Sequence, residues 1–119
     1  MKKALGEKFE FCLLVILSTN LAYAEEVHCA CGIDAWSFDM SKQYYYFSGI
    51  WKEDDRYSCN DNEFVSYVMS RMSADGMDSI GVPWCAAFPD YYSANDERVA
   101  RGNSAESSGH QVKATNWKP

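Results

Sequence analysis

Four cysteines that lie beyond the first 24 residues constrain the fold of this chain more than any other feature of its sequence. Cys29 and Cys31 are separated by one residue, whereas Cys59 and Cys85 stand alone. A bridge between Cys29 and Cys31 would be badly strained, so each of these two must reach a distant partner. Two pairings stay open: Cys29–Cys59 with Cys31–Cys85, or Cys29–Cys85 with Cys31–Cys59. Either pairing ties the CAC segment to two distant points of the chain.

A structural zinc site is the other chemistry that four cysteines can provide. Such sites usually draw on two pairs of ligands, each pair about two to four residues apart. This chain has one close pair with a single intervening residue, next to His28. The spacing therefore favours two disulfides, and we expect neither a metal nor another cofactor.

The first 24 residues predict a signal peptide. Three lysines among the first eight residues precede an apolar run over residues 9–17, and Ala22 and Ala24 suit a cleavage site after Ala24. The apolar run is about half of the roughly 20 residues that a membrane span needs. The fifth cysteine, Cys12, leaves with this segment, and an even number remains in the mature chain. We expect a protein that begins at Glu25 in the bacterial periplasm or outside the cell, with no stable membrane insertion.

Charge narrows the class of partner. Removing residues 1–24 takes away three Lys and two Glu, which changes the formal net charge from −6 to −7. Nucleic acids and anionic lipids are bound through cationic surfaces, so neither is expected as a partner. A cationic protein would suit the acidic chain. The 95 residues after the signal are enough for one domain, which we place at residues 25–101 with a flexible tail at 102–119.

The residue pattern predicts a mainly α domain of three to four short helices. The strongest helix follows Cys59, where Asn60 and Glu63 suit a capping box and Gly76 suits a stop. Its apolar residues recur at helical spacing: Phe64, Val65, Val68, Met69 and Met72. Further helices are expected after Ser41, around Cys85 and over residues 94–101. Residues 102–119 are mostly small and polar, which predicts a disordered tail.

The segment PWCAAF, residues 83–88, resembles the nucleophile segment of CHAP-type cell-wall amidases, and the later Gly-His at 109–110 resembles their histidine segment. The resemblance implies a cysteine hydrolase with Cys85 as nucleophile and His110 as base. It covers about six residues of the chain. In that family a small β-barrel positions the histidine, whereas only 24 residues separate Cys85 from His110 here, and Pro89 would interrupt the nucleophile helix. The hydrolase is therefore the alternative, and a disulfide is the expected role of Cys85.

Tyrosines and acidic residues are the candidate binding groups. Successive residues of a helix point about 100° apart, so not all three rings in a row of tyrosines can face the core. The acidic residues cluster around Cys59, and their spacing does not fit a calcium loop. The candidates are Tyr44, Tyr45, Tyr46, Asp54, Asp55, Asp61 and Glu63.

The leading hypothesis from these features is a small exported protein that acts by contact and not by catalysis. Its partner would be another envelope protein. Periplasmic inhibitors, immunity proteins and accessory proteins of secretion or plasmid-transfer machines share this general outline, which is an analogy of class without a motif behind it.

Overall fold

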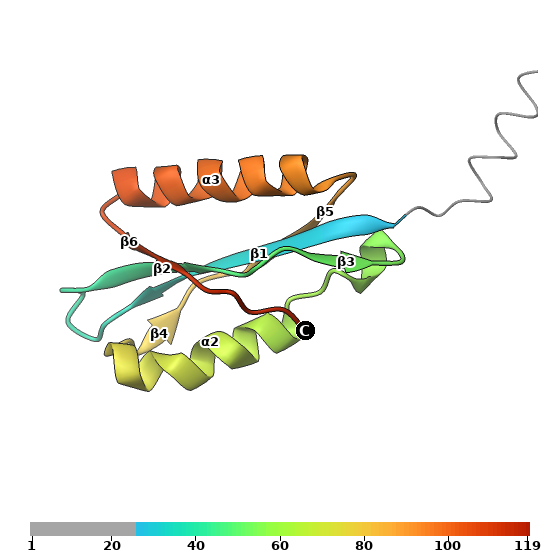
Figure 1. The fold of residues 1–119 in the computed structure, drawn as a ribbon. Helices are drawn as coiled ribbons and strands as arrows, with labels where there is room; N and C mark the ends of the chain where they lie inside the picture. Colours follow the sequence, from blue (N-terminus) through green and yellow to red (C-terminus); the bar gives the residue numbers. More distant parts are fainter. Residues whose placement is uncertain (1–25) are drawn as a thin grey trace, which may run out of the picture.

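The computed structural model describes residues 26–119, so the predicted signal segment lies outside the described range. Within residues 26–119, six strands form one mixed sheet, and an α-helix covers each of its faces (Figure 1). The prediction of a mainly α domain is therefore wrong. In chain order the elements are β1 (Val27–Trp36), β2 (Gln43–Phe47), β3 (Trp51–Glu53), η1 (Arg56–Ser58), α2 (Asn62–Asp75), β4 (Ser79–Ile80), β5 (Trp84–Phe88), α3 (Tyr91–Ser107) and β6 (Gln111–Ala114).

Strand β1 is the centre of the sheet. It pairs antiparallel with β2 and β3 along one edge and with β4 and β5 along the other. Strand β6 extends the sheet by pairing in parallel with β2, with Tyr45 opposite Val112. Four separate strands thus pair with one ten-residue strand, which also carries two of the four cysteines.

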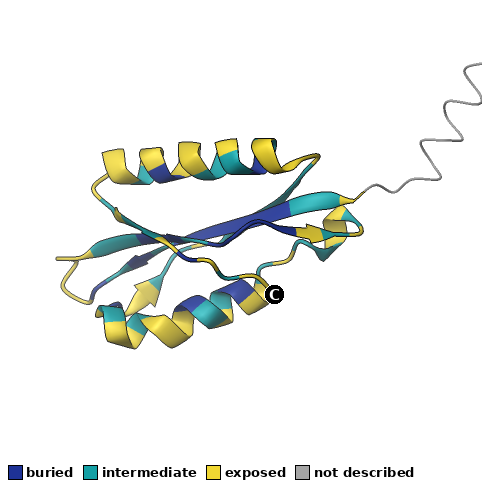
Figure 2. Cartoon of the chain, in the orientation of Figure 1, coloured by how far each residue is buried: buried dark blue, intermediate teal, exposed yellow. Residues whose placement is uncertain are grey.

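Both faces of β1 are buried (Figure 2). The face towards α2 belongs to a core that includes Phe64 and Val68, whereas Ala30 on the other face packs with Ala94 of α3. A strand that is covered on both faces has no solvent-facing row of polar side chains, so the alternation that usually reveals a strand is weak in its sequence. The residues of β1 that face α2 are Cys29, Cys31, Ile33 and Ala35.

The segment after Ser41 is a strand and not the expected helix. Residues Gln43–Phe47 form β2 and are mostly aromatic, a composition that favours a pleated, buried surface. Ile50 and Trp51 are also buried, but Ile50 lies in the connection after β2 and Trp51 begins β3. The expected short helix around Cys85 is likewise strand β5.

The helix after Cys59 is confirmed as α2, and it ends where Gly76 adopts the left-handed conformation with φ 76°. Gly76 donates its N–H to the carbonyls of Met72 and Ser73, which satisfies two groups at the end of the helix. Within residues 26–119, no helix is long and apolar enough to cross a lipid bilayer.

The predicted disordered tail is wrong. Helix α3 runs through the expected boundary at residue 101 to Ser107, and Gly102 lies inside it, buried near Phe47 and Val112 of the sheet. After β6, the Thr115 hydroxyl donates to the Phe47 carbonyl at 2.8 Å. The ring of Trp117 then packs 5.5 Å from the ring of Trp51. Isolated apolar residues in this segment are anchors that hold the C-terminal chain on the sheet.

The two disulfides are Cys29–Cys59 and Cys31–Cys85, the first of the two open pairings. Cys29–Cys59 ties β1 to the segment that leads into α2. Cys31 and Cys85 are directly opposite each other on β1 and β5, with Cα atoms 4.1 Å apart. Two such bridges are compatible with a protein that folds in an oxidising compartment.

Candidate functional site

Cys85 and His110 lie on opposite faces of the sheet. The Cys85 side chain is bonded to Cys31 and packs with the core on the α2 side. His110 follows α3, and its ring lies beside Asp34 on the side that α3 covers. The thiolate and the neighbouring base that the hydrolase alternative requires are therefore not brought together in this structure.

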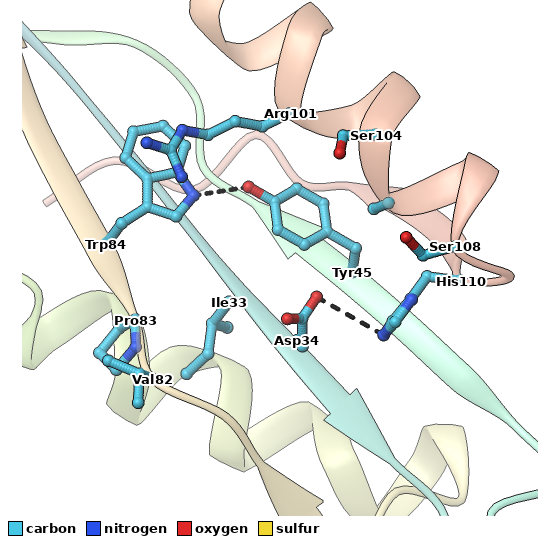
Figure 3. A pocket seen from close by; sticks show the side chains of 11 residues that line it. Ile33, Asp34, Tyr45, Val82, Pro83, Trp84, Arg101, Ser104, Ser108 and His110 are labelled. Atoms are coloured by element: carbon cyan, nitrogen blue, oxygen red, sulfur yellow. Dashed lines mark hydrogen bonds and ion pairs between the residues drawn. The ribbon is translucent and has the colours of Figure 1, made fainter.

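His110 lines a pocket of about 380 Å³ between the sheet and the C-terminal half of α3 (Figure 3). The floor comes from β1, and one wall comes from β2. The other walls are the loop that leads into β5 and the last turns of α3. Figure 3 shows Arg101, Trp84 and the Tyr45 hydroxyl at one end of the pocket, with Asp34 and His110 at the other end.

Trp84 and Tyr45 meet across β1. The indole N–H of Trp84 donates to the Tyr45 hydroxyl at 2.6 Å. Gly32 permits this contact, because a Cβ at that position would overlap both the Tyr45 hydroxyl and the Trp84 ring nitrogen. Burial raises the pKa of Tyr45, so the hydroxyl keeps its proton at neutral pH.

Arg101 covers the face of Trp84, with its guanidinium carbon 4.1 Å from the centre of the indole ring. Its Nε donates to Glu97 Oε2 at 2.7 Å, one helical turn away on α3. The ion pair and the stacking together orient the guanidinium along the mouth of the pocket. Arg101 is itself exposed, so solvent screens its charge.

At the opposite end of the pocket, His110 Nε2 lies 3.6 Å from Asp34 Oδ1. This distance is too long for a hydrogen bond but suits an ion pair when the imidazole is protonated. Both ring nitrogens of His110 are buried, and neither has a hydrogen-bond partner among residues 26–119. The ring of Trp36 packs against the imidazole, with the ring centres 6.0 Å apart. Buried nitrogens without a hydrogen-bond partner are costly, and these two belong to a side chain that lines the pocket.

The three candidate tyrosines lie on β2 and alternate between the two faces of the sheet. Tyr46 is buried on the α2 side, where its hydroxyl donates to Asp75 Oδ2 at 2.6 Å. Burial and this bond to a carboxylate raise the pKa of Tyr46. Tyr44 is half-buried near Tyr46, and Tyr45 is the buried pocket residue described above. Truncating Tyr46 would therefore disturb the core on the α2 side, and truncating Tyr45 would remove part of the pocket wall.

The structure does not bring the four acidic candidates into one cluster. Asp55 accepts hydrogen bonds from the N–H groups of Tyr57 and Ser58, and so caps η1. Asp61 precedes α2, while Asp54 and Glu63 are exposed. No group of three or more His, Cys, Asp or Glu residues within the described range could hold a metal ion.

The tip of the β1–β2 hairpin is a feature that the sequence reading missed. Phe38 is 89% exposed and Met40 is 55% exposed. Met40 also has a φ of 63°, which is uncommon for a residue other than glycine and is tolerated only where the surroundings impose it. The sequence signal that could have predicted this turn is Asp39 between Ser37 and Ser41, because such residues are typical of tight turns.

Hydrogen bonds hold this tip in one conformation. Asp39 Oδ1 accepts from the N–H of Ser41 at 3.0 Å, from the Ser41 hydroxyl at 2.7 Å and from the Ser37 hydroxyl at 2.9 Å. The Ser41 backbone bond contributes most to lowering the pKa of Asp39, to about 2. The Phe38 N–H donates to Asp78 Oδ2 at 2.6 Å, which anchors the tip to the segment before β4.

The chain matches no family model, no curated protein and no solved structure. Function must therefore be inferred from the side chains themselves. Within the described residues, the pocket beside α3 and the tip of the β1–β2 hairpin are two places where groups are both oriented and free to contact another molecule.

Proposed function

We propose that this chain is an exported protein that binds another protein, and that the tip of the β1–β2 hairpin enters a cleft of that partner. The observation that carries the proposal is Phe38, a large apolar side chain 89% exposed on a turn that is already ordered. Exposure of the Phe38 ring to water is unfavourable, and burial in a partner would remove this apolar surface from water. Because the turn is held by internal hydrogen bonds, little conformational entropy would be lost on binding.

Charge supports a partner with a basic rim around its cleft. Asp39 and Asp78 flank Phe38, and the chain without its predicted signal carries a formal net charge of −7. Opposite charge on the partner would accelerate the encounter, while Phe38 and Met40 would slow dissociation. The acidic candidates Asp54 and Asp55 lie away from the tip, so their part would be limited to long-range attraction.

Export is supported by the predicted signal peptide and by the two disulfides, which suit the periplasm or the extracellular space. A rigid apolar projection on a small cross-linked domain suits an inhibitor or an immunity protein, which must fill a cleft in its target. An accessory protein of a secretion or plasmid-transfer machine would use the same kind of contact. The Cys85/His110 hydrolase is the weaker candidate, because Cys85 would first have to be released from Cys31.

The test compares two exposed aromatic residues at opposite ends of the sheet. A photo-crosslinking amino acid is placed at Phe38 in one variant and at Tyr92, 77% exposed at the start of α3, in the other (Figure 1). We expect a discrete cross-linked protein from position 38 only. With that protein purified, Phe38→Ser should weaken its affinity at least tenfold, while Tyr92→Ser should leave it unchanged.

Two results would contradict the proposal. One is cross-linking from Tyr92 with none from Phe38, which would place the binding surface at the other end of the molecule. The other is an equal loss of affinity in the two serine variants. A cross-linked partner whose contact region is acidic would reject the basic cleft while leaving the tip as the contact.

A further inference from the structure

We propose that the pocket beside α3 binds a small molecule that carries both a carboxylate and an amino group, such as a free amino acid or an unblocked dipeptide. The pocket volume of about 380 Å³ lies in the range of small-molecule sites, which span roughly 300 to 1,000 Å³. Its walls combine apolar surface from Pro83 and Trp84 with polar groups from β1, β2 and α3. The proposal concerns a different part of the molecule from the hairpin tip and does not depend on it.

One end of the pocket offers hydrogen-bond donors that remain free. Tyr45 accepts from Trp84, so its own O–H is available, and within residues 26–119 it donates to no group. Arg101 uses Nε for Glu97, and its two terminal nitrogens make no hydrogen bond in the described part of the chain. Ser104 lies nearby on the same face of α3 (Figure 3). A planar carboxylate matches such a group of donors better than a neutral oxygen does.

The other end of the pocket offers acceptors. Asp34 presents a carboxylate whose side chain is 40% exposed, and the ring of His110 lines the same end. A primary ammonium has three N–H donors, and the Asp34 carboxylate can accept from it. The C-terminal end of α3 lies beside His110, and the partial negative charge of that end also favours a cation.

The walls are fixed before any ligand arrives. The Cys31–Cys85 bridge holds β1 against β5 directly beside Gly32 and Trp84, which face each other in the same register. The hydrogen bond between Trp84 and Tyr45 then joins the wall on β5 to the wall on β2. A site built on cross-linked strands keeps its donors and acceptors at a set separation, and this selects ligands by the spacing of their charges.

The experiment uses the folded, disulfide-bonded protein and the common L-amino acids together with unblocked dipeptides. Binding is measured by isothermal titration calorimetry and by the change in tryptophan fluorescence relative to a Trp84→Phe variant, because a ligand would change the environment of Trp84. We expect at least one unblocked compound to bind. Its N-acetyl derivative and its C-terminal amide should each bind at least tenfold more weakly.

Substitutions test which end of the pocket binds the carboxylate of the ligand and which end binds its amino group. Arg101→Met should abolish the preference for the acid over the amide, and Asp34→Asn should abolish the preference for the free amine over the acetylated form. Arg71→Met is the matched control, because Arg71 is also exposed and its guanidinium lies 5.8 Å from the centre of the Tyr67 ring on α2. This control should bind like the unmodified protein, and Arg101→Lys should recover part of the preference for the acid.

Specific results would overturn the proposed ligand site. Absence of binding by every unblocked compound at millimolar concentration would overturn the proposal, provided that circular dichroism shows the protein folded. Equal binding of blocked and unblocked forms would also overturn it, because recognition would then not involve the two charges. An Arg71→Met variant that behaves like Arg101→Met would show that the loss arises from general destabilisation.

Discussion

At Gly32, the absence of a side chain decides whether two strands can share a hydrogen bond. The Tyr45 hydroxyl and the Trp84 indole occupy the space where a Cβ would lie. Gly102 on α3 presents a contrasting case, because a Cβ there would meet Phe47 at 3.8 Å and Val112 at 3.9 Å, which are ordinary contact distances. The two glycines therefore serve different ends: Gly32 keeps a pocket wall in place, and Gly102 is simply small on a buried helix face.

We expect opposite effects when each glycine is replaced by alanine. Gly32→Ala should destabilise the fold by about 1–3 kcal/mol, because the extra methyl group must displace the rings of Tyr45 and Trp84. Gly102→Ala should be neutral or stabilise by up to about 1 kcal/mol, since alanine favours a helix and the space accommodates it. Urea denaturation of both variants gives the comparison. Equal stability of Gly32→Ala and the unmodified protein would mean that the Trp84–Tyr45 contact is absent in solution.

Among the elements, the β1–β2 hairpin shows how short polar side chains can order an exposed apolar tip. Asp39 accepts three hydrogen bonds from two serines, and the chain turns back within a few residues. The same turn leaves Phe38 and Met40 without neighbours to cover them. An element whose order comes from polar bonds and whose surface is apolar is suited to contact with another protein.

The pH dependence of the tip follows from the lowered pKa of Asp39. A carboxyl group whose pKa is lower in the folded protein stabilises the fold above its ordinary pKa, near 3.9, and loses that effect as the pH falls through about 2. Carboxyl-detected NMR should place the titration midpoint of Asp39 near pH 2. Ser41→Ala removes one hydroxyl donor while keeping the backbone bond, so its midpoint should rise part of the way towards the ordinary value. A midpoint near 3.9 in the unmodified protein would show that the tip is not ordered as described.

Across the whole molecule, two cores lie on opposite faces of one sheet, and both disulfides connect β1 to other segments on the α2 side. One bridge joins neighbouring strands, and the other joins β1 to the entry of α2 across 30 residues. A domain of this size buries a modest core, so cross-links that restrict the unfolded chain carry a large share of its stability.

Replacing both Cys29 and Cys59 by alanine should lower the free energy of unfolding by about 2–5 kcal/mol, the usual cost of losing a native bridge in a small exported domain. Both residues are changed so that no free thiol remains to exchange with the other bridge. Urea denaturation measures the loss, and peptide mapping of the unmodified protein should recover Cys29–Cys59 and Cys31–Cys85. An unchanged melting temperature after full reduction would contradict the role given to both bridges.

The sequence alone determined the features that depend on local chemistry. The single residue between Cys29 and Cys31 limited the disulfides to two pairings, one of which the structure contains. The spacing of apolar residues after Cys59 and the glycine at position 76 predicted α2, because helix periodicity and a left-handed stop are read within one segment. For the candidate site, the sequence marked Tyr45 and His110 but supplied neither the neighbours nor the role of either residue.

Only the tertiary structure decided the fold class and the pocket. Helices cover both faces of the sheet, so β1 and β2 have no solvent-facing row of polar side chains and their strand pattern is weak in the sequence. The C-terminal segment looked disordered because its few apolar residues are scattered, yet each finds a partner once β6 pairs with β2. The pocket joins Asp34, Tyr45, Trp84 and Arg101, which lie on four different elements. Their proximity depends on long-range strand pairing and helix packing, and no local pattern in a sequence records contacts between segments so far apart.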